Sequence, residues 1–116
     1  MRHDSDCLFC RIVAGEIPAT IVFSDDHTVA FRDIQPAAPT HVLVIPREHI
    51  RSLHELEPAD HDVLRALAMS TQRVAELEGI AGAGYRVVTN VGADGGQSVD
   101  HLHFHVLGGR QLRGLG

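Results

Sequence analysis

The chain contains no lysine, and all ten of its basic residues are arginine. This absence excludes chemistry through a Schiff base or a lysine nucleophile. Long apolar runs are also missing: the longest, 42–45 and 66–69, have four residues each, whereas about 20 are needed to cross a bilayer. The first six residues do not lead into the apolar stretch of a secretory signal. We therefore expect a soluble, cytoplasmic protein that does not bind membranes.

Cysteine is scarce, and basic charge is outnumbered by acidic charge. Ten basic and fifteen acidic residues give a net charge of −5, which would repel the phosphates of a nucleic-acid polymer but not exclude a single small anion held locally. The two cysteines, Cys7 and Cys10, are too few and too close in sequence for a disulfide framework. The residues alone leave free thiols, a redox pair and a metal site as alternatives.

Length and composition predict one domain over residues 1–116, because a chain of this size with 44% hydrophobic residues can bury a single core. Apolar periodicity and turn residues predict its elements. They are a short helix at 7–14, strands at 21–23, 29–31 and 42–45, a long helix at 58–78, and strands at 85–91 and 100–107. This order favours an α+β fold with a five-stranded, mostly antiparallel sheet. The apolar strand 42–45 should be central.

The segment 101–107 alternates histidine with apolar residues. On a strand, His101, His103 and His105 would share one face and the apolar residues the other. A solvent-exposed face of this composition is improbable for three histidines in strict alternation. Two chemical interpretations stay open from the strand alone: a histidine-ligated metal site, and a neutral imidazole that attacks phosphorus as a nucleophile.

A polar, glycine-rich loop precedes the histidines. It supplies flexible backbone N–H groups, amides and a hydroxyl from Asn90, Gly92, Gly95, Gly96, Gln97 and Ser98. In isolation the loop is equally well explained as a simple turn between two strands. Next to three histidines, a phosphate site becomes the better explanation.

Two segments carry a family resemblance. NVGADGGQSVDHLHFHVLGGR at 90–110 and FRDIQPAAPTHVLVIPREH at 31–49 resemble the signature segments of the histidine triad family of nucleotide-binding proteins. The similarity extends from about residue 7 to 111 and is greatest to the branch that hydrolyses purine nucleoside phosphoramidates. The transferase branch has Gln where this chain has His105, and the dinucleoside polyphosphate hydrolases do not continue with GGRQ at 108–111.

The resemblance implies a role for each polar residue of the site. His103 would attack the α-phosphorus of an AMP-like substrate and form a nucleotidyl-histidine that water cleaves. The main-chain oxygen of His101 would hold the Nδ1 proton of His103. His105 and His41 would complete the polar cluster around the phosphate. Ser98 would assist departure of the amine, which leaves readily only when protonated.

The resemblance also implies a purine nucleotide site. Asp33 would bind both ribose hydroxyls, while the loop residues Asn90, Gly96, Gln97 and Ser98, with His103 and His105, would surround the phosphate. The base would lie between apolar walls formed by Leu8, Phe9, Ile12, Phe31, Ile34 and Leu43. For any single one of these six, an ordinary place in the core is as good an explanation as the pocket.

Bacterial relatives of this kind hold zinc with two N-terminal cysteines and two histidines, which here correspond to Cys7, Cys10, His49 and His101. Two thiolates and two imidazoles form a closed tetrahedral set, so that such a zinc would be structural. Without the resemblance, free thiols would be the preferred interpretation. With it, Zn²⁺ is the expected cofactor, and no organic cofactor is expected.

We further expect a homodimer with a continuous ten-stranded sheet, first from the resemblance. The helix 58–78 is also apolar over a broad arc, and the strand 85–91 would lie at a sheet edge that invites pairing. Three other functions remain open at this point: a nucleotide-binding regulatory or scaffold protein with incidental hydrolysis, a dinucleoside polyphosphate hydrolase, and a histidine-ligated metalloenzyme. Turnover of an adenosine phosphoramidate and sensitivity to chelators would separate these alternatives.

Overall fold

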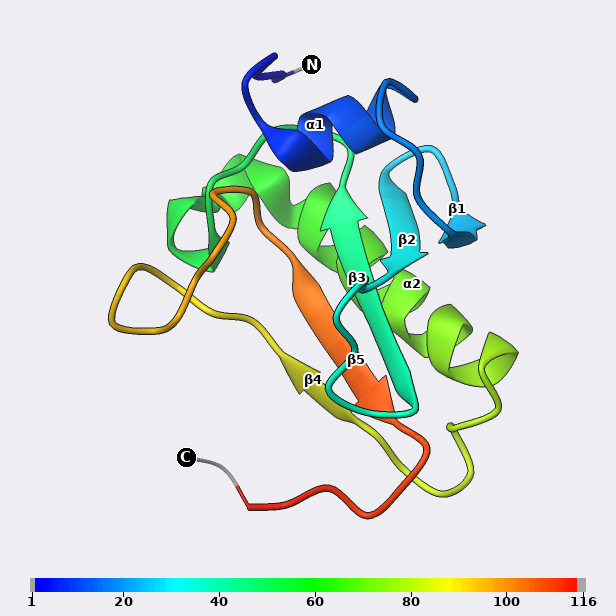
Figure 1. The fold of residues 1–116 in the computed structure, drawn as a ribbon. Helices are drawn as coiled ribbons and strands as arrows, with labels where there is room; N and C mark the ends of the chain where they lie inside the picture. Colours follow the sequence, from blue (N-terminus) through cyan, green and yellow to red (C-terminus); the bar gives the residue numbers. More distant parts are fainter. Residues whose placement is uncertain (1, 115–116) are drawn as a thin grey trace.

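The computed structural model describes residues 2–114 as a five-stranded sheet with a helix on each face (Figure 1). In chain order the elements are α1 (Leu8–Val13), β1 (Ile21–Ser24), β2 (Thr28–Arg32), β3 (Thr40–Pro46), two 3₁₀ turns (Leu53–Glu55 and Pro58–Asp60), α2 (His61–Leu77), β4 (Arg86–Val88) and β5 (Phe104–Gly108). The predicted α+β class is confirmed.

The sheet has the strand order β1-β2-β3-β5-β4, and every neighbouring pair is antiparallel. The β3 strand is central, as its uninterrupted apolar run predicts, and all seven of its residues are buried. Its register with β5 places Leu43 opposite His105 and Val42 opposite Val106. The β4 strand lies at one edge, also as predicted.

The long helix α2 covers the face of the sheet that points away from the viewer in Figure 1. Its buried positions recur at helical spacing and pack with apolar residues of β2, β3 and β5. Leu102 and Val106 belong to this core, and Phe104 packs against it. The apolar residues between the histidines therefore share one face, as the alternation predicts.

The short helix α1 lies on the opposite face, in front of the sheet (Figure 1). Cys7 is its N-cap, and Sγ of Cys7 accepts a hydrogen bond from the backbone N–H of Cys10 at 3.3 Å. Phe9 packs edge-on against Phe31, with ring centroids 5.4 Å apart. This second, smaller core connects α1 to β2 and β3, and it positions the front face for the site described below.

Three predicted boundaries are wrong, each for an identifiable reason. Residues 58–60 form a 3₁₀ turn instead of the first helical turn, because Glu57 and Asp60 make a reciprocal capping box there. The strand predicted at 85–91 ends at Val88, and Thr89 instead donates its hydroxyl to the carbonyl of His103.

The strand predicted at 100–107 begins only at Phe104. Before it, the backbone N–H of Leu102 donates to the carbonyl of Ile50, outside the sheet. His101 and His103 consequently lie in the irregular segment that leads into β5. Across residues 2–114, no helix is long and apolar enough to cross a membrane.

Candidate active site and metal cluster

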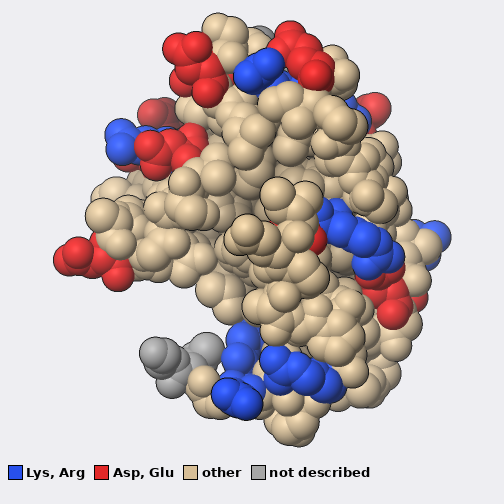
Figure 2. All heavy atoms as spheres, in the orientation of Figure 1, with Lys and Arg blue, Asp and Glu red and all other residues tan. Residues whose placement is uncertain are grey.

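A cavity of about 850 Å³ opens on the α1 side of the sheet. Its walls come from α1, from residues 17–20, from the end of β2 with the loop that follows it, and from the segment 98–105. Charged side chains gather mainly around the margin of this face, and most of its centre is uncharged (Figure 2). The volume and the apolar walls suit a small organic ligand with a few fixed polar contacts.

The structure brings together most of the residues predicted for a nucleotide site. The cavity is lined by the six predicted apolar wall residues and by four predicted polar residues, Asp33, Ser98, His103 and His105. His41 lies directly behind His105 and bonds to it. The predicted residues that do not line the cavity are Asn90, Gly96, Gln97, His101 and His41 itself.

His103 is buried, and its ring contacts the edge of Phe9 at a centroid distance of 5.3 Å. Its Nδ1 lies 2.6 Å from the main-chain oxygen of His101. A carbonyl oxygen can only accept, so Nδ1 must carry the proton of the neutral ring. The lone pair is therefore on Nε2, which is the arrangement that a nucleophilic imidazole requires.

The tautomers of His41 and His105 follow from a similar chain of hydrogen bonds. The backbone N–H of Ala37 donates to Nδ1 of His41 at 3.0 Å, so the His41 proton is on Nε2. That Nε2 lies 2.9 Å from Nδ1 of His105 and 3.4 Å from a carboxylate oxygen of Asp33. His105 accepts through Nδ1 and therefore carries its own proton on Nε2, where it can be donated to an anion.

Burial keeps this pair neutral. Burial, and after it the neighbouring imidazoles of His103 and His41, lower the pKa of His105 to about 4. The pKa of His41 is also lowered by burial, with the Asp33 carboxylate acting in the opposite direction. At neutral pH the cluster consequently offers an N–H donor beside the His103 lone pair, without a net positive charge on either of these two rings.

The glycine loop acts on the shape of the site. Gln97 accepts from the backbone N–H of Gly92 and donates to the carbonyls of Arg51 and Val99. Asn90 donates to the carbonyl of Gly95 at 2.7 Å. Both predicted binding side chains are thus engaged by backbone groups of the loop and of its neighbours Arg51 and Val99.

A second cluster lies beside the cavity and contains Cys7, Cys10, His49 and His101. One ligand atom from each residue lies within 4.8 Å of all the others. The distances are 3.3 Å from Cys7 Sγ to His101 Nδ1, 3.4 Å from Cys10 Sγ to His49 Nδ1, and 3.6 Å from Cys10 Sγ to His101 Nδ1. A tetrahedral zinc with two S and two N ligands requires S···N separations of about 3.5 Å. The donor set and its spacing therefore fit such an ion.

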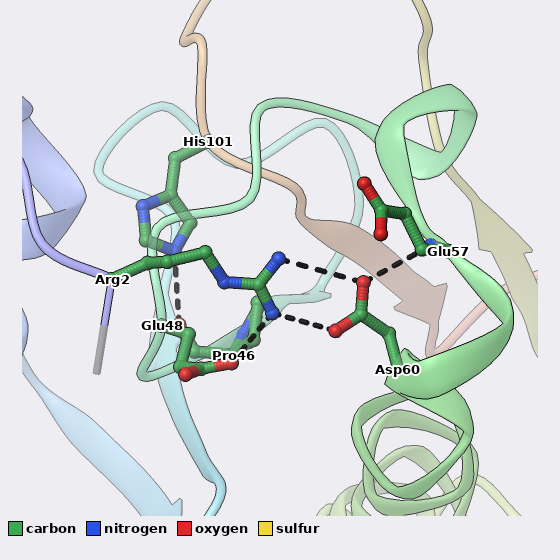
Figure 3. A network of polar contacts seen from close by, with 6 residues as sticks. All are labelled: Arg2, Pro46, Glu48, Glu57, Asp60 and His101. Carbon is green, nitrogen blue, oxygen red and sulfur yellow. Dashed lines mark hydrogen bonds and ion pairs between the residues drawn. The ribbon is translucent and has the colours of Figure 1, made fainter.

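The surroundings of the cluster orient its ligands (Figure 3). Nε2 of His101 donates to the carbonyl oxygen of Pro46 at 2.9 Å, which leaves the Nδ1 lone pair directed at the thiols. Burial lowers the pKa of His101 to about 4 and raises that of the Cys10 thiol to about 11. Binding of a cation would therefore displace a proton from Cys10 and meet an unprotonated imidazole.

Sequence reasoning missed several residues of the cavity wall. These are Ile17, Pro18, Ala19, Thr20, Arg32, Gln35 and Val99. The segment 17–20 follows a glycine with φ of +77° and contains a proline, which indicates an extended connection. Nothing in its sequence shows that this connection folds against the cavity, so only Gln35 and Val99, beside Asp33 and Ser98, had a local signal.

The chain is similar to known proteins over almost its whole length. The sequence model of the HIT domain matches residues 14–112. The purine nucleoside phosphoramidase of Escherichia coli strain K12 is 43% identical over 107 residues, which cover 92% of this chain and 90% of that protein.

Two solved structures have the same fold. A HIT family hydrolase from Legionella pneumophila Philadelphia 1 superimposes with a TM-score of 0.90 at 48% identity, covering 93% of this chain and 96% of that one. A histidine triad protein from Clostridium difficile gives a TM-score of 0.94 at 40% identity, covering 98% and 99%.

Proposed function

The chain belongs to the HIT domain family, and from this premise we propose that it hydrolyses purine nucleoside phosphoramidates through a nucleotidyl intermediate on His103. The observation that carries the proposal is the 2.6 Å hydrogen bond from Nδ1 of His103 to the His101 carbonyl, which leaves the Nε2 lone pair free. The phosphoramidase from E. coli, 43% identical, supports the substrate class.

The reaction has two steps. Nε2 of His103 attacks the α-phosphorus, an N–P bond to the imidazole forms, and the substrate P–N bond breaks. The departing amine must gain a proton, and the Ser98 hydroxyl is placed at the cavity wall to assist this transfer. Water then attacks the nucleotidyl-histidine, which releases the nucleoside monophosphate and restores His103. His105 donates its Nε2 proton as a hydrogen bond to a phosphoryl oxygen in both steps.

The nucleoside occupies the remainder of the cavity in this proposal. Asp33 binds the ribose hydroxyls, and the base packs between Phe9, Phe31 and the aliphatic wall residues. A purine fits because its larger surface contacts more of these walls than a pyrimidine would. Asn90, Gly96 and Gln97 contribute to phosphate binding through the loop backbone that they hold in place.

We also propose that Cys7, Cys10, His49 and His101 bind a structural zinc ion. Four protein ligands close the coordination sphere, so the ion would supply folding energy and no reactive position. Its connection to catalysis passes through His101, whose imidazole belongs to the cluster and whose carbonyl holds His103.

The proposed assembly is a homodimer that pairs β4 with β4 of a second copy. Val87 on this edge strand is 43% exposed, and apolar side chains are also exposed on α2, at Leu64, Met69 and Leu77. A two-fold contact through β4 would cover Val87 and extend the sheet to ten strands.

Trapping of the intermediate tests the function. The protein is mixed with adenosine 5′-phosphoramidate, quenched in alkali to preserve the N–P bond, and analysed by mass spectrometry. We expect one adenylyl group on the peptide that contains His103, and none in His103→Ala. His54→Ala, which alters an exposed histidine outside the site, should behave as the wild type does.

Turnover without an adduct at His103 would contradict the covalent mechanism. Nucleotide binding without any turnover would instead favour a nucleotide-binding regulatory protein. Activity that persists after complete removal of metal by chelators would exclude the metalloenzyme alternative.

A further inference from the structure

The N-terminal segment is attached to the rest of the protein at both of its ends. At one end, the Arg2 guanidinium lies 2.6 Å from Asp60 Oδ1 and 2.7 Å from Glu48 Oε2 (Figure 3). At the other, Cys7 caps α1 and enters the metal cluster. The main chain of Arg2 also takes part, because its carbonyl accepts the backbone N–H of His49 at 2.8 Å.

Arg2 thus binds two consecutive residues after β3 in two different ways. Its side chain holds the carboxylate of Glu48, and its carbonyl holds the backbone of His49, one of the four candidate ligands. The contacts span 46 and 58 residues of sequence. Hydrogen bonds from Arg2 accordingly lower the pKa of both Glu48 and Asp60.

Asp60, the carboxylate that Arg2 contacts next to α2, is itself held in place by hydrogen bonds. Asp60 closes the capping box before α2, and its carboxylate accepts the backbone N–H of Glu57 at 3.0 Å. A guanidinium that holds two carboxylates at once, one of them already bonded to backbone, loses less mobility per bond than an isolated surface pair. The Arg11–Glu16 pair, at 3.4 Å between two exposed side chains, is such an isolated pair.

From these contacts we propose that Arg2 is a positioning residue for the metal ligands Cys7, Cys10, His49 and His101. The proposal rests on the metal site assigned above. Arg2 holds the cysteine-bearing segment against the His49 loop, so that ligands from distant parts of the chain stay at bonding distance before an ion arrives. Such preorganisation raises affinity because less ordering remains to be done on binding.

The effect must be reciprocal. If Arg2 favours the arrangement that binds the ion, then the bound ion favours the arrangement in which Arg2 meets Glu48 and Asp60. Loss of the Arg2 side chain should therefore destabilise the metal-loaded protein more than the metal-free protein. Loss of a contact that only stabilises the fold would destabilise both forms equally.

Competition titration with a chromophoric zinc chelator tests the proposal on the full chain. We expect Arg2→Ala to weaken zinc binding about 10- to 100-fold, the usual effect of losing a group that orients metal ligands, and Arg2→Lys to recover part of the loss. Arg11→Ala is the matched control and should bind zinc as the wild type does. Melting temperatures of loaded and metal-free proteins complete the cycle.

Two outcomes would overturn the inference: Arg2→Ala that binds zinc as tightly as Arg11→Ala, or an equal loss of melting temperature in both metal states. If Arg2→Ala does not fold, Asp60→Asn removes the charge of one of the two carboxylates that Arg2 holds and should weaken zinc binding in the same direction. A wild-type chain that binds no zinc would overturn the metal site itself, and the inference with it. Failure of the metal site is thereby distinguished from failure of the role proposed for Arg2.

Discussion

The main-chain oxygen of His101 accepts a 2.6 Å hydrogen bond from Nδ1 of His103, while the imidazole of His101 lies in the cysteine-containing cluster. His101 therefore belongs to the candidate active site through its carbonyl and to the metal cluster through its imidazole. The carbonyl selects the tautomer of the candidate nucleophile, and the ring is available to a metal ion. The orientation of the reacting imidazole thus depends on how firmly the segment before β5 is held.

Removal of the metal should lower the thermal stability of the protein more than it lowers the rate of turnover. Cys10→Ala is expected to lose zinc and to melt about 10 °C lower, since ~1 kcal/mol corresponds to roughly 4 °C in a domain of this size and a structural zinc supplies several kcal/mol. The segment before β5 keeps two backbone hydrogen bonds, to Val99 and Ile50, so turnover at low temperature should fall by no more than about 10-fold. Elemental analysis, thermal melts and initial rates measure the three effects.

Asp33 should act through the ribose. Asp33→Asn is expected to raise the KM for adenosine 5′-phosphoramidate by about 10- to 100-fold, because a charged hydrogen bond contributes roughly 1.5–3 kcal/mol. The 2′,3′-dideoxy substrate should be nearly insensitive to the substitution. If kcat for the dideoxy substrate fell as well, Asp33 would be acting through His41, whose Nε2 lies 3.4 Å away.

Stability should fall with acidification through His105. Its pKa is lowered to about 4 by burial and by the imidazoles of His103 and His41, against about 6.5 in an unfolded chain. Below pH 6.5 the unfolded chain therefore takes up a proton at this residue before the folded protein does, and the free energy of unfolding decreases down to about pH 4.

The matched variant is His105→Gln, which cannot take up that proton. Melting temperatures between pH 7.5 and 4.5 should decline less steeply in this variant than in the wild type, whatever its stability at neutral pH. Parallel declines would show that the dependence arises from other groups.

The glycine loop should tolerate no side chain at Gly95. A Cβ there would collide with the carbonyl oxygen of Val91, so Gly95→Ala must move the backbone that supports Ser98. We expect kcat/KM to fall by about 10-fold or more, because misplacement of Ser98 by a fraction of an ångström disrupts a reactive geometry. Gly82→Ala is the control, since nothing lies within 4 Å of a Cβ at that position. Equal activity of the two variants would contradict a supporting role for the loop.

Assembly should depend on one edge of the sheet and not on the other. Val87→Glu, in β4, is expected to shift the protein from a dimer to a mass near 12.6 kDa, the single-chain value. Ile21→Glu in β1, at the opposite edge and 50% exposed, should leave the dimer intact. Light scattering at micromolar concentration measures both, and a wild-type monomer would contradict the proposed interface.

The elements that sequence predicts best are those with a dominant local signal. The apolar run of β3, the capped helix α1 and the periodicity of α2 all formed within a few residues of their predicted bounds. The β5 boundary was wrong because Leu102 takes a hydrogen-bond partner from Ile50, a contact that no local pattern contains. Asp60 likewise ends a 3₁₀ turn, where its carboxylate accepts from both the distant Arg2 and the backbone of Glu57 in the capping box.

The candidate site shows the same division. Alternation placed the apolar residues between the histidines on one face, and the structure confirms it. It could not show that His101 and His105 would enter different clusters, because that depends on Cys7 in one case and His41 in the other. Cys-x2-Cys spacing alone did not identify His49 as a partner, and the family resemblance supplied it.

The buried strand β3 carries consequences for how this chain can vary in length. His41 lies near its beginning and the carbonyl of Pro46, which anchors His101, lies at its end, about 17 Å away at 3.3–3.4 Å per residue. A one-residue insertion or deletion inside β3 would turn His41 to the α2 face and displace the anchor of His101 in the same event. Length changes in this strand would thus remove both centres together, whereas surface connections such as 81–84 can absorb them.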